Sequence, residues 1–470
     1  MVAVIALILA LVLGPIIAIP LGKKYGYASN AVVVVLLGAA VFPRTVLTLV
    51  RAPESTPYDV STASLGVQTQ VIAFVIAAVV ILLGGGKIKL PIALIIFVVL
   101  LTAGMFTSWQ GTVPQWSGYF MLVGAVIAFG VGWAVGREAF TRERFALFFL
   151  TLILIVLVIQ LGVSMLQLAG VSLPTGLVNS DRTLEQTVGR VSGTIGHPAN
   201  LSKVALLLML LSLPFTSAAS KRLSRLAFLC VALAAFLGGL TVSRANLIAM
   251  AVLLAAWILT FPGRARIGTR IGGAVAFAGA ALVFAPLVLE RFEDDADGGL
   301  RPLLLAAAWR QLSNDFLIGT GPNAYIAVVG RTDAATASGY PVHNALLLMT
   351  AELGLLLAVL FFLPLFGILL WGFVRFARSS EFLYTPRVLV YSIPGLGVVL
   401  LTGWGMISVL IIGLWMFSLG FLSSSRAGVT LESITSRERE AQAAGVAGAR
   451  SLVTAVARLP HRYDGGSRDV

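Results

Sequence analysis

The sequence predicts an all-α protein that crosses a membrane about 12 or 13 times and carries a large external loop before its third-last helix. Of its 470 residues, 58% are hydrophobic and only 11% are charged, whereas a soluble domain carries roughly 25% charged residues. Apolar runs of about 18 or more residues, long enough to cross roughly 30 Å of hydrocarbon, recur along the chain. These runs lack the alternation of an outer-membrane barrel strand, so helices are the expected way to satisfy the backbone in lipid.

The apolar runs give thirteen expected crossings, or twelve if the first or last segments are miscounted. Lys23 and Lys24 follow the first run, whereas a signal peptide carries its positive charges before it, so we expect that run to be retained. A turn at 402–405 divides the last apolar stretch in two. Segment 343–374 exceeds one crossing and is expected to project above the membrane or to bend at Pro364. The expected segments are 3–22, 30–50, 68–85, 88–107, 116–136, 146–169, 199–219, 225–242, 245–262, 270–289, 343–374, 388–403 and 405–425.

The charge pattern gives the expected orientation of a membrane domain over 1–425 and a basic tail over 426–470. The formal net charge is +13, and most of the 33 Lys and Arg residues lie in every second connection and in the tail. Basic connections face the cytoplasm, which leaves the loop 290–342 outside. The basic residues serve this topology, and we find no nucleic-acid motif. With a single cysteine, Cys230, neither an intrachain disulfide nor a cysteine metal site is expected.

Basic residues on the predicted outer face are nearly all Arg, and topology does not require them there. Arg suits bidentate binding of phosphate or carboxylate, so these residues suggest a membrane-bound anion such as a lipid phosphate. For any single Arg, the alternative is an ion pair with an external acid such as Glu54 or Asp333. The set is Arg44, Arg51, Arg182, Arg190, Lys203, Arg244, Arg291, Arg301, Arg310 and Arg331.

Two short motifs on this face favour ligand binding. The loop 189–200 carries glycines that let backbone amides approach a ligand, and Pro198 suits the first turn of a helix whose N-terminus favours anions. The alternative is a loop that merely caps this helix. In the connection 241–246, Arg244 stands between two apolar runs with no adjacent acid. Such a residue either binds something or extends to the membrane surface.

Two of the three histidines lie on the outer face. His343, followed by Asn344, ends the large loop, where a neutral imidazole could take a proton from a hydroxyl. A lone histidine is also commonly a structural cap. His197 lies in the loop 189–200, and His461 lies in the tail.

In this order, the motifs resemble the O-antigen ligase and O-antigen polymerase superfamily, over about 190 to 370. The matching elements are an Arg-x-x-Gly-x-x-x-x-Pro-x-Asn pattern, a Ser-Arg pair, a Trp-Arg followed by Gly-x-Gly-Pro, and a His-Asn before Glu-x-Gly. Here they read Arg190, Gly193, Pro198 and Asn200; Ser243-Arg244; Trp309-Arg310; Gly319 to Pro322; His343-Asn344; and Glu352 to Gly354. Arg310 and Gly321 also fit a spacing found in polymerase members. Leu357, where a second Gly is usual, and His197 depart from the pattern.

The resemblance implies transfer of a glycan from a polyprenyl-diphosphate lipid to a glycan, lipid or protein acceptor at the outer face of the plasma membrane. It implies His343 as the catalytic base and Arg190, Arg244 and Arg310 as diphosphate ligands, with Gly321, Asn344 and His197 in support. The arginines can stabilise the leaving diphosphate, so we expect no cofactor or metal. The residues do not separate a ligase from a polymerase. A flippase for lipid-linked sugar and a non-catalytic membrane scaffold are competing hypotheses.

Overall fold

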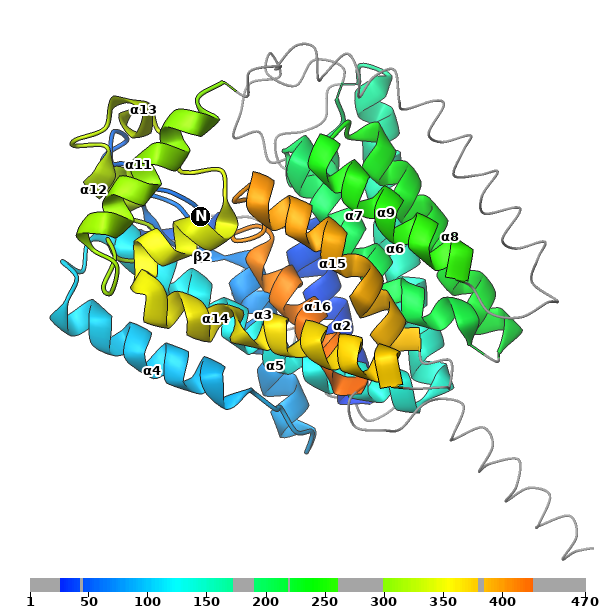
Figure 1. The fold of residues 1–470 in the computed structure, drawn as a ribbon. Coiled ribbons are helices and arrows are strands. Elements are labelled where there is room, and N and C mark those ends of the chain that lie inside the picture. Colours follow the sequence, from blue (N-terminus) through cyan, green and yellow to red (C-terminus); the bar gives the residue numbers. More distant parts are fainter. Residues whose placement is uncertain are drawn as a thin grey trace, which may run out of the picture.

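The computed structural model describes residues 26–42, 45–171, 190–218, 220–260, 299–378 and 384–425. Helices make up most of these residues, which confirms the all-α fold class (Figure 1). The expected segments 3–22 and 270–289 and the tail 426–470 lie outside the described residues.

Within the described residues, six helices are long and apolar enough to cross a membrane, and further apolar helices are shorter. The protein is therefore a multi-pass membrane protein. The long helices are α5 (Val113–Thr141), α6 (Glu143–Leu168), α7 (Pro198–Ser212) with its 3-10 extension (Leu213–Ser217), α8 (Lys221–Leu240), α14 (Ala345–Arg378) and α15 (Tyr384–Thr402). The shorter ones are α2 (Tyr27–Val35) with a π-helical turn (Leu36–Val41), α3 (Thr69–Leu83), α4 (Ile92–Thr107), α9 (Arg244–Thr260) and α16 (Ile412–Ser424).

The prediction of one helix over 30–50 is wrong in its second half. The helical segment ends at Val41, and β1 (Thr45–Val50) pairs antiparallel with β2 (Leu65–Gln68). Thr and Val in β1 are β-branched and favour a strand, although the run is as apolar as a membrane helix. The two strands carry the intervening segment 51–64 to the cavity described below.

Helix α14 is interrupted at Gly354, a break that is neither of the two expected alternatives, projection above the membrane or a bend at Pro364. Gly354 has a φ of 73°, which interrupts the helix. The amide of Leu355 therefore donates to the carbonyl of Phe316, 2.9 Å away. The carbonyls of Ala351 and Glu352 accept instead from the amides of Thr320 and Gly321. The segment that precedes α14 thus satisfies the backbone groups that the break exposes.

The predicted external loop is itself helical where it is described. It contains α11 (Arg301–Asn314), α12 (Tyr325–Val329) and α13 (Ala334–Ala337), which lie together at one end of the molecule (Figure 1). The predicted turn at 402–405 is confirmed, because α15 ends at Thr402, although α16 begins only at Ile412.

Glycines bring α5 and α16 into backbone contact at the centre of the fold. A Cβ on Gly420 would lie 1.9 Å from the carbonyl oxygen of Phe129, and a Cβ on Gly132 would lie 2.0 Å from that of Phe417. Gly136 is similarly close to Phe421. This spacing of small residues allows two membrane helices to pack at short range.

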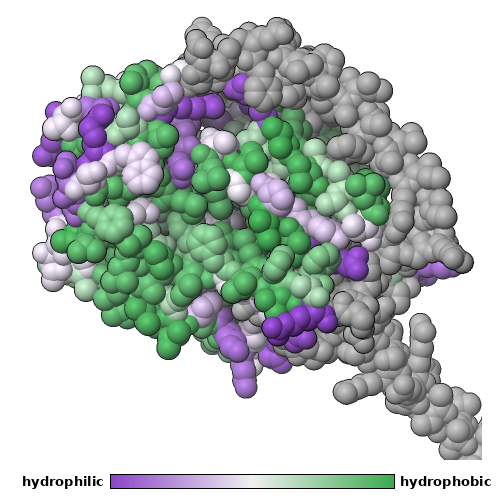
Figure 2. All heavy atoms as spheres, in the orientation of Figure 1, coloured by the Kyte–Doolittle hydropathy of each residue, from purple (hydrophilic) through white to green (hydrophobic). Residues whose placement is uncertain are grey.

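The distribution of apolar and polar residues on the surface is also that of a membrane protein. Figure 2 shows a broad apolar area over α4, α14 and α15, with polar residues gathered where α11 to α13 lie. Exposed side chains such as Leu356, Leu363, Phe366 and Leu370 contribute to this area on α14. An apolar surface of this extent is typical of a protein that lies in lipid.

Candidate functional site

A cavity of about 1920 Å³ connects the motifs that the sequence singled out. Its wall is formed by the loop before α7, the α8–α9 connection, the loop 324–343, the segment 54–62 and the α15–α16 connection. Four of the seven predicted site residues line it: Arg190, His197, Arg244 and His343. Residues separated by more than 150 positions in the sequence therefore share one site.

Arg190 links the loop before α7 to the α8–α9 connection. Its Nε donates to the backbone carbonyl of Thr241, 3.0 Å away. This bond places the guanidinium beside the turn from which α9 begins at Arg244. Both arginines thus enter the cavity from adjacent backbone segments.

The α8–α9 turn holds an unusual backbone conformation. Val242 has a φ of 50°, a region that a β-branched residue rarely adopts and that costs of order 1–3 kcal/mol. Asn246, one turn into α9, donates from its Nδ2 to the Oγ of Ser243 at 2.9 Å and to the carbonyl of Ala199 at 3.2 Å. The strained turn is therefore fixed to the first turn of α7.

The two histidines that line the cavity differ in their local role. His197 is the N-cap of α7, and its Nδ1 accepts from the amide of Ala199 at 3.2 Å. His343 lies immediately before α14, while the Oδ1 of Asn344 accepts from the amide of Leu347 at 3.0 Å. Asn344 caps the helix, so His343 is held at the cavity wall without being the cap itself.

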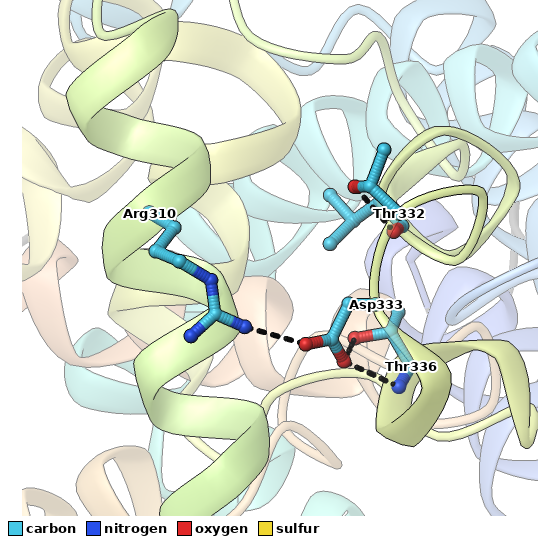
Figure 3. Close-up of polar contacts among 5 residues, drawn as sticks. Arg310, Thr332, Asp333 and Thr336 are labelled. Atoms are coloured by element: carbon cyan, nitrogen blue, oxygen red, sulfur yellow. Dashed lines mark hydrogen bonds and ion pairs between the residues drawn. The ribbon is translucent and has the colours of Figure 1, made fainter.

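Arg310 is placed outside the cavity. On α11, its Nη2 forms an ion pair with the Oδ2 of Asp333 at 2.5 Å, and the Arg310 side chain is 63% exposed (Figure 3). The other carboxylate oxygen of Asp333 accepts from the amide and hydroxyl of Thr336. The bond to the Thr336 amide is the main reason why the pKa of Asp333 lies below its ordinary value. Arg310 thus ties α11 to α13, which is the ion-pair alternative that the sequence left open.

Gly321 and Asn323 join the segment 299–342 to the rest of the fold. Gly321, with a φ of 92°, donates its amide to the carbonyl of Glu352 at 2.7 Å. The Oδ1 of Asn323 accepts from the amides of Asp59, Val60 and Ser61 at 2.9 to 3.0 Å. Gly321 therefore supports the loop and does not line the cavity.

Asp59 completes this junction. Its carboxylate accepts from the amides of Tyr325 and Ile326 at the start of α12, and it also faces the side chain of Glu352. Burial raises the pKa of Asp59 above its ordinary value, while the hydrogen bonds from Glu352 and from the two amides oppose that rise. We call the set Asp59, Asn323 and Glu352 the loop clamp.

Three cations of the cavity wall were not selected as site residues from the sequence. Arg301 and Arg331 come from the segment 299–342, and Lys203 comes from α7. All three belonged to the predicted set of outer-face basic residues, so the signal was present in their position relative to the topology. Among the described residues, the carboxylates lining the cavity are Glu54 and Asp59, so the cavity carries an excess of positive charge.

No model of a known protein family matches the chain, and no curated protein matches it. In the described part of the chain, no cluster of His, Cys, Asp or Glu is arranged to hold a metal ion. The chemistry of the cavity is therefore argued from its own residues. Clustered Arg and Lys with two imidazoles suit a ligand that carries phosphate and a hydroxyl that loses a proton.

Proposed function

We propose that the protein is an O-antigen ligase-like glycosyltransferase of the plasma membrane. It would move a glycan from a polyprenyl-diphosphate donor to a hydroxyl acceptor at the outer face. The observation that carries this proposal is the convergence of Arg190, Arg244 and His343 on one cavity. A donor of this kind has a lipid chain that requires a membrane and a diphosphate that requires cations, and the protein offers both.

The reaction assigns a separate task to each residue. The acceptor oxygen forms a bond to the anomeric carbon while the bond from that carbon to the diphosphate oxygen breaks. The diphosphate leaves with the bonding electrons, and Arg190 and Arg244 stabilise its charge. His343 accepts the proton of the acceptor hydroxyl. In-line attack inverts the anomeric centre, and the arginines provide the charge that a metal would otherwise supply.

A polymerase of the same superfamily is the nearest alternative, because it shares the donor chemistry and differs in the acceptor. A carrier for lipid-linked sugar is a second candidate. It is favoured by Lys203 and Glu352, which are ionisable residues in candidate membrane spans and are both buried. Such residues often mark transport paths. Turnover of donor without any gradient separates an enzyme from a carrier.

The test is reconstitution in liposomes with a polyprenyl-diphosphate oligosaccharide and candidate acceptors, with released polyprenyl diphosphate as the readout. Wild type is compared with His343→Ala, Arg244→Ala and Arg144→Ala, the last an exposed arginine away from the cavity. We expect wild type and Arg144→Ala to release the lipid and the other two variants to lose at least about a hundredfold in rate. Equal release by all four would refute the assigned roles, and transport of intact donor without release would favour the carrier.

A further inference from the structure

Lys203 is a buried cation within a candidate membrane span, and it lines the cavity. The residue is only 8% exposed. Its Nζ has one hydrogen bond within the described residues, to the carbonyl of Ala199 in its own helix, at 3.4 Å. No described carboxylate forms an ion pair with it. A lysine at this depth without an acidic partner is costly unless a ligand compensates it.

Asn246 faces the same position from α9. Its Nδ2 donates to the same Ala199 carbonyl, so the Lys203 and Asn246 side chains meet at one backbone oxygen. The residue is 2% exposed, and its Oδ1 accepts no hydrogen bond from any described residue. The pair therefore offers a cationic donor and a neutral acceptor to whatever occupies the cavity.

Glycine at position 405 leaves the room that the Lys203 ammonium group occupies. A Cβ at Gly405 would lie 2.3 Å from the Lys203 Nζ and 3.7 Å from the Asn200 Oδ1. Any larger residue would displace the ammonium group. Trp404, which precedes Gly405 and is half-buried, adds an aromatic side chain to this part of the cavity wall.

We propose that Lys203, Asn200 and Asn246 form a subsite for an acidic sugar residue of the glycan. The carboxylate or phosphate of that sugar accepts from Lys203, and a ring hydroxyl donates to Asn246. A sulfonate, an anion without a hydroxyl, satisfies the first contact but supplies no donor for the second. This inference rests on the proposed glycosyltransferase function and adds that the glycan is acidic.

The subsite is tested by ligand-observed NMR titration of the full chain in detergent. The probes are methyl glucuronide, glucose 6-phosphate, neutral methyl glucoside and methanesulfonate. The variants are Lys203→Gln, which removes the charge, Gly405→Ala, which displaces it, and Lys87→Gln, an exposed lysine away from the cavity.

We expect wild type and Lys87→Gln to bind an acidic sugar about tenfold more tightly than methyl glucoside, the effect of one charge-assisted hydrogen bond. Both cavity variants should reduce this preference to less than about twofold. Preference for the glucuronide alone assigns a carboxylate, and preference for the phosphate sugar alone assigns a phosphate. Either result supports the subsite.

Two results would overturn the subsite. One is a wild type without charge preference, or a preference that survives Lys203→Gln. The other is methanesulfonate binding as tightly as the acidic sugars, which would remove the sugar from the assignment. Release of polyprenyl diphosphate is measured in parallel, so an intact turnover with a failed subsite is distinguishable from a failure of the proposed function itself.

Discussion

Two buried asparagines show how this molecule uses polar groups in different ways. Asn323 is fully buried, and both ends of its amide are satisfied by backbone groups: three amides donate to Oδ1, and Nδ2 donates to the carbonyls of Thr62 and Pro114. Asn246 is nearly as buried, yet its Oδ1 has no partner among the described residues. The first belongs to the loop clamp and the second to the cavity wall.

The comparison separates groups that hold the fold from groups that are available to a ligand. A buried polar group satisfied within the protein stabilises one arrangement of the chain, and removing it leaves its partners unpaired. A buried polar group that lines a cavity with spare bonding capacity gains most when a ligand is bound. The predictions below test this distinction, from the largest expected effect to the smallest.

The largest effect is expected on stability from Asn323→Gly. Glycine keeps the φ of 57° that Asn323 adopts, so the change removes the amide without adding backbone strain. Three donors and two acceptors lose their partner, which should cost at least about 3 kcal/mol. The matched Asn246→Gly variant should cost no more than about 2 kcal/mol, because it removes two hydrogen bonds and adds a glycine to a helix.

Denaturant unfolding in detergent measures both variants, with the loss of tryptophan fluorescence as the signal. An Asn246→Gly variant that is as unstable as Asn323→Gly would contradict the distinction between clamp and cavity. It would mean that the α7–α9 contact is as important to the fold as the loop clamp.

The next effect separates two arginines that the sequence assigned to the same task. Arg244 lines the cavity, whereas Arg310 pairs with Asp333 on the surface. Under the proposed function, Arg244→Ala should lower donor turnover at least about a hundredfold. Arg310→Ala should lower it less than about threefold and cost at most about 1 kcal/mol of stability, since an exposed ion pair contributes little.

Release of polyprenyl diphosphate and unfolding midpoints are measured on the same preparations of both variants. If Arg310→Ala were as inactive as Arg244→Ala while retaining its stability, Arg310 would have to reach the donor in a conformation other than the one observed.

These arginines also show what the sequence could and could not predict. Arg190, Arg244 and His343 stand in local motifs at helix boundaries, so hydropathy and spacing were enough to bring them to one face. The partner of Arg310 is 23 positions away in a loop, and no local pattern indicates that contact. Lys203 was visible as an outer-face cation, but its surroundings depend on Gly405, which lies on another helix connection.

The fold was predictable to a similar degree. Long apolar runs determine membrane helices because lipid allows few backbone structures, and the all-α class followed. Hydropathy cannot separate the strand Thr45–Val50 from a helix, since both are apolar. The break of α14 at Gly354 likewise depends on the turn 319–321, which supplies hydrogen bonds from a distant segment.

A third prediction concerns the pH dependence of the loop clamp. Burial raises the pKa of Asp59, so the folded state binds this proton more tightly than the unfolded chain does. The stabilising contribution is complete below the ordinary pKa of about 3.9 and is lost as the pH rises through the raised value. Glu352→Gln replaces the facing carboxyl with an amide that cannot ionise, so the clamp of the variant loses one proton instead of two as the pH rises.

The expected result is a shallower fall in the unfolding temperature above about pH 4, equivalent to about 1 kcal/mol across the transition. Scanning fluorimetry of wild type and Glu352→Gln from about pH 4 to about pH 8 measures it. The exposed variant Glu54→Gln serves as the matched control, because its carboxylate is outside the clamp. Parallel pH profiles for wild type and Glu352→Gln would show that the two carboxyl groups are not linked.

The smallest effect is expected at Val242, where strain accompanies a position on the cavity wall. Val242→Gly relieves about 1–2 kcal/mol of left-handed strain but gives the unfolded chain more freedom, so a net gain of about 0.5 kcal/mol is expected. If the strain holds Arg244 in place for the donor, turnover should fall while stability rises. If Val242→Gly gains stability and keeps full turnover, the conformation of Val242 affects only the stability of the fold. The geometry of the turn is then not required for turnover of the donor.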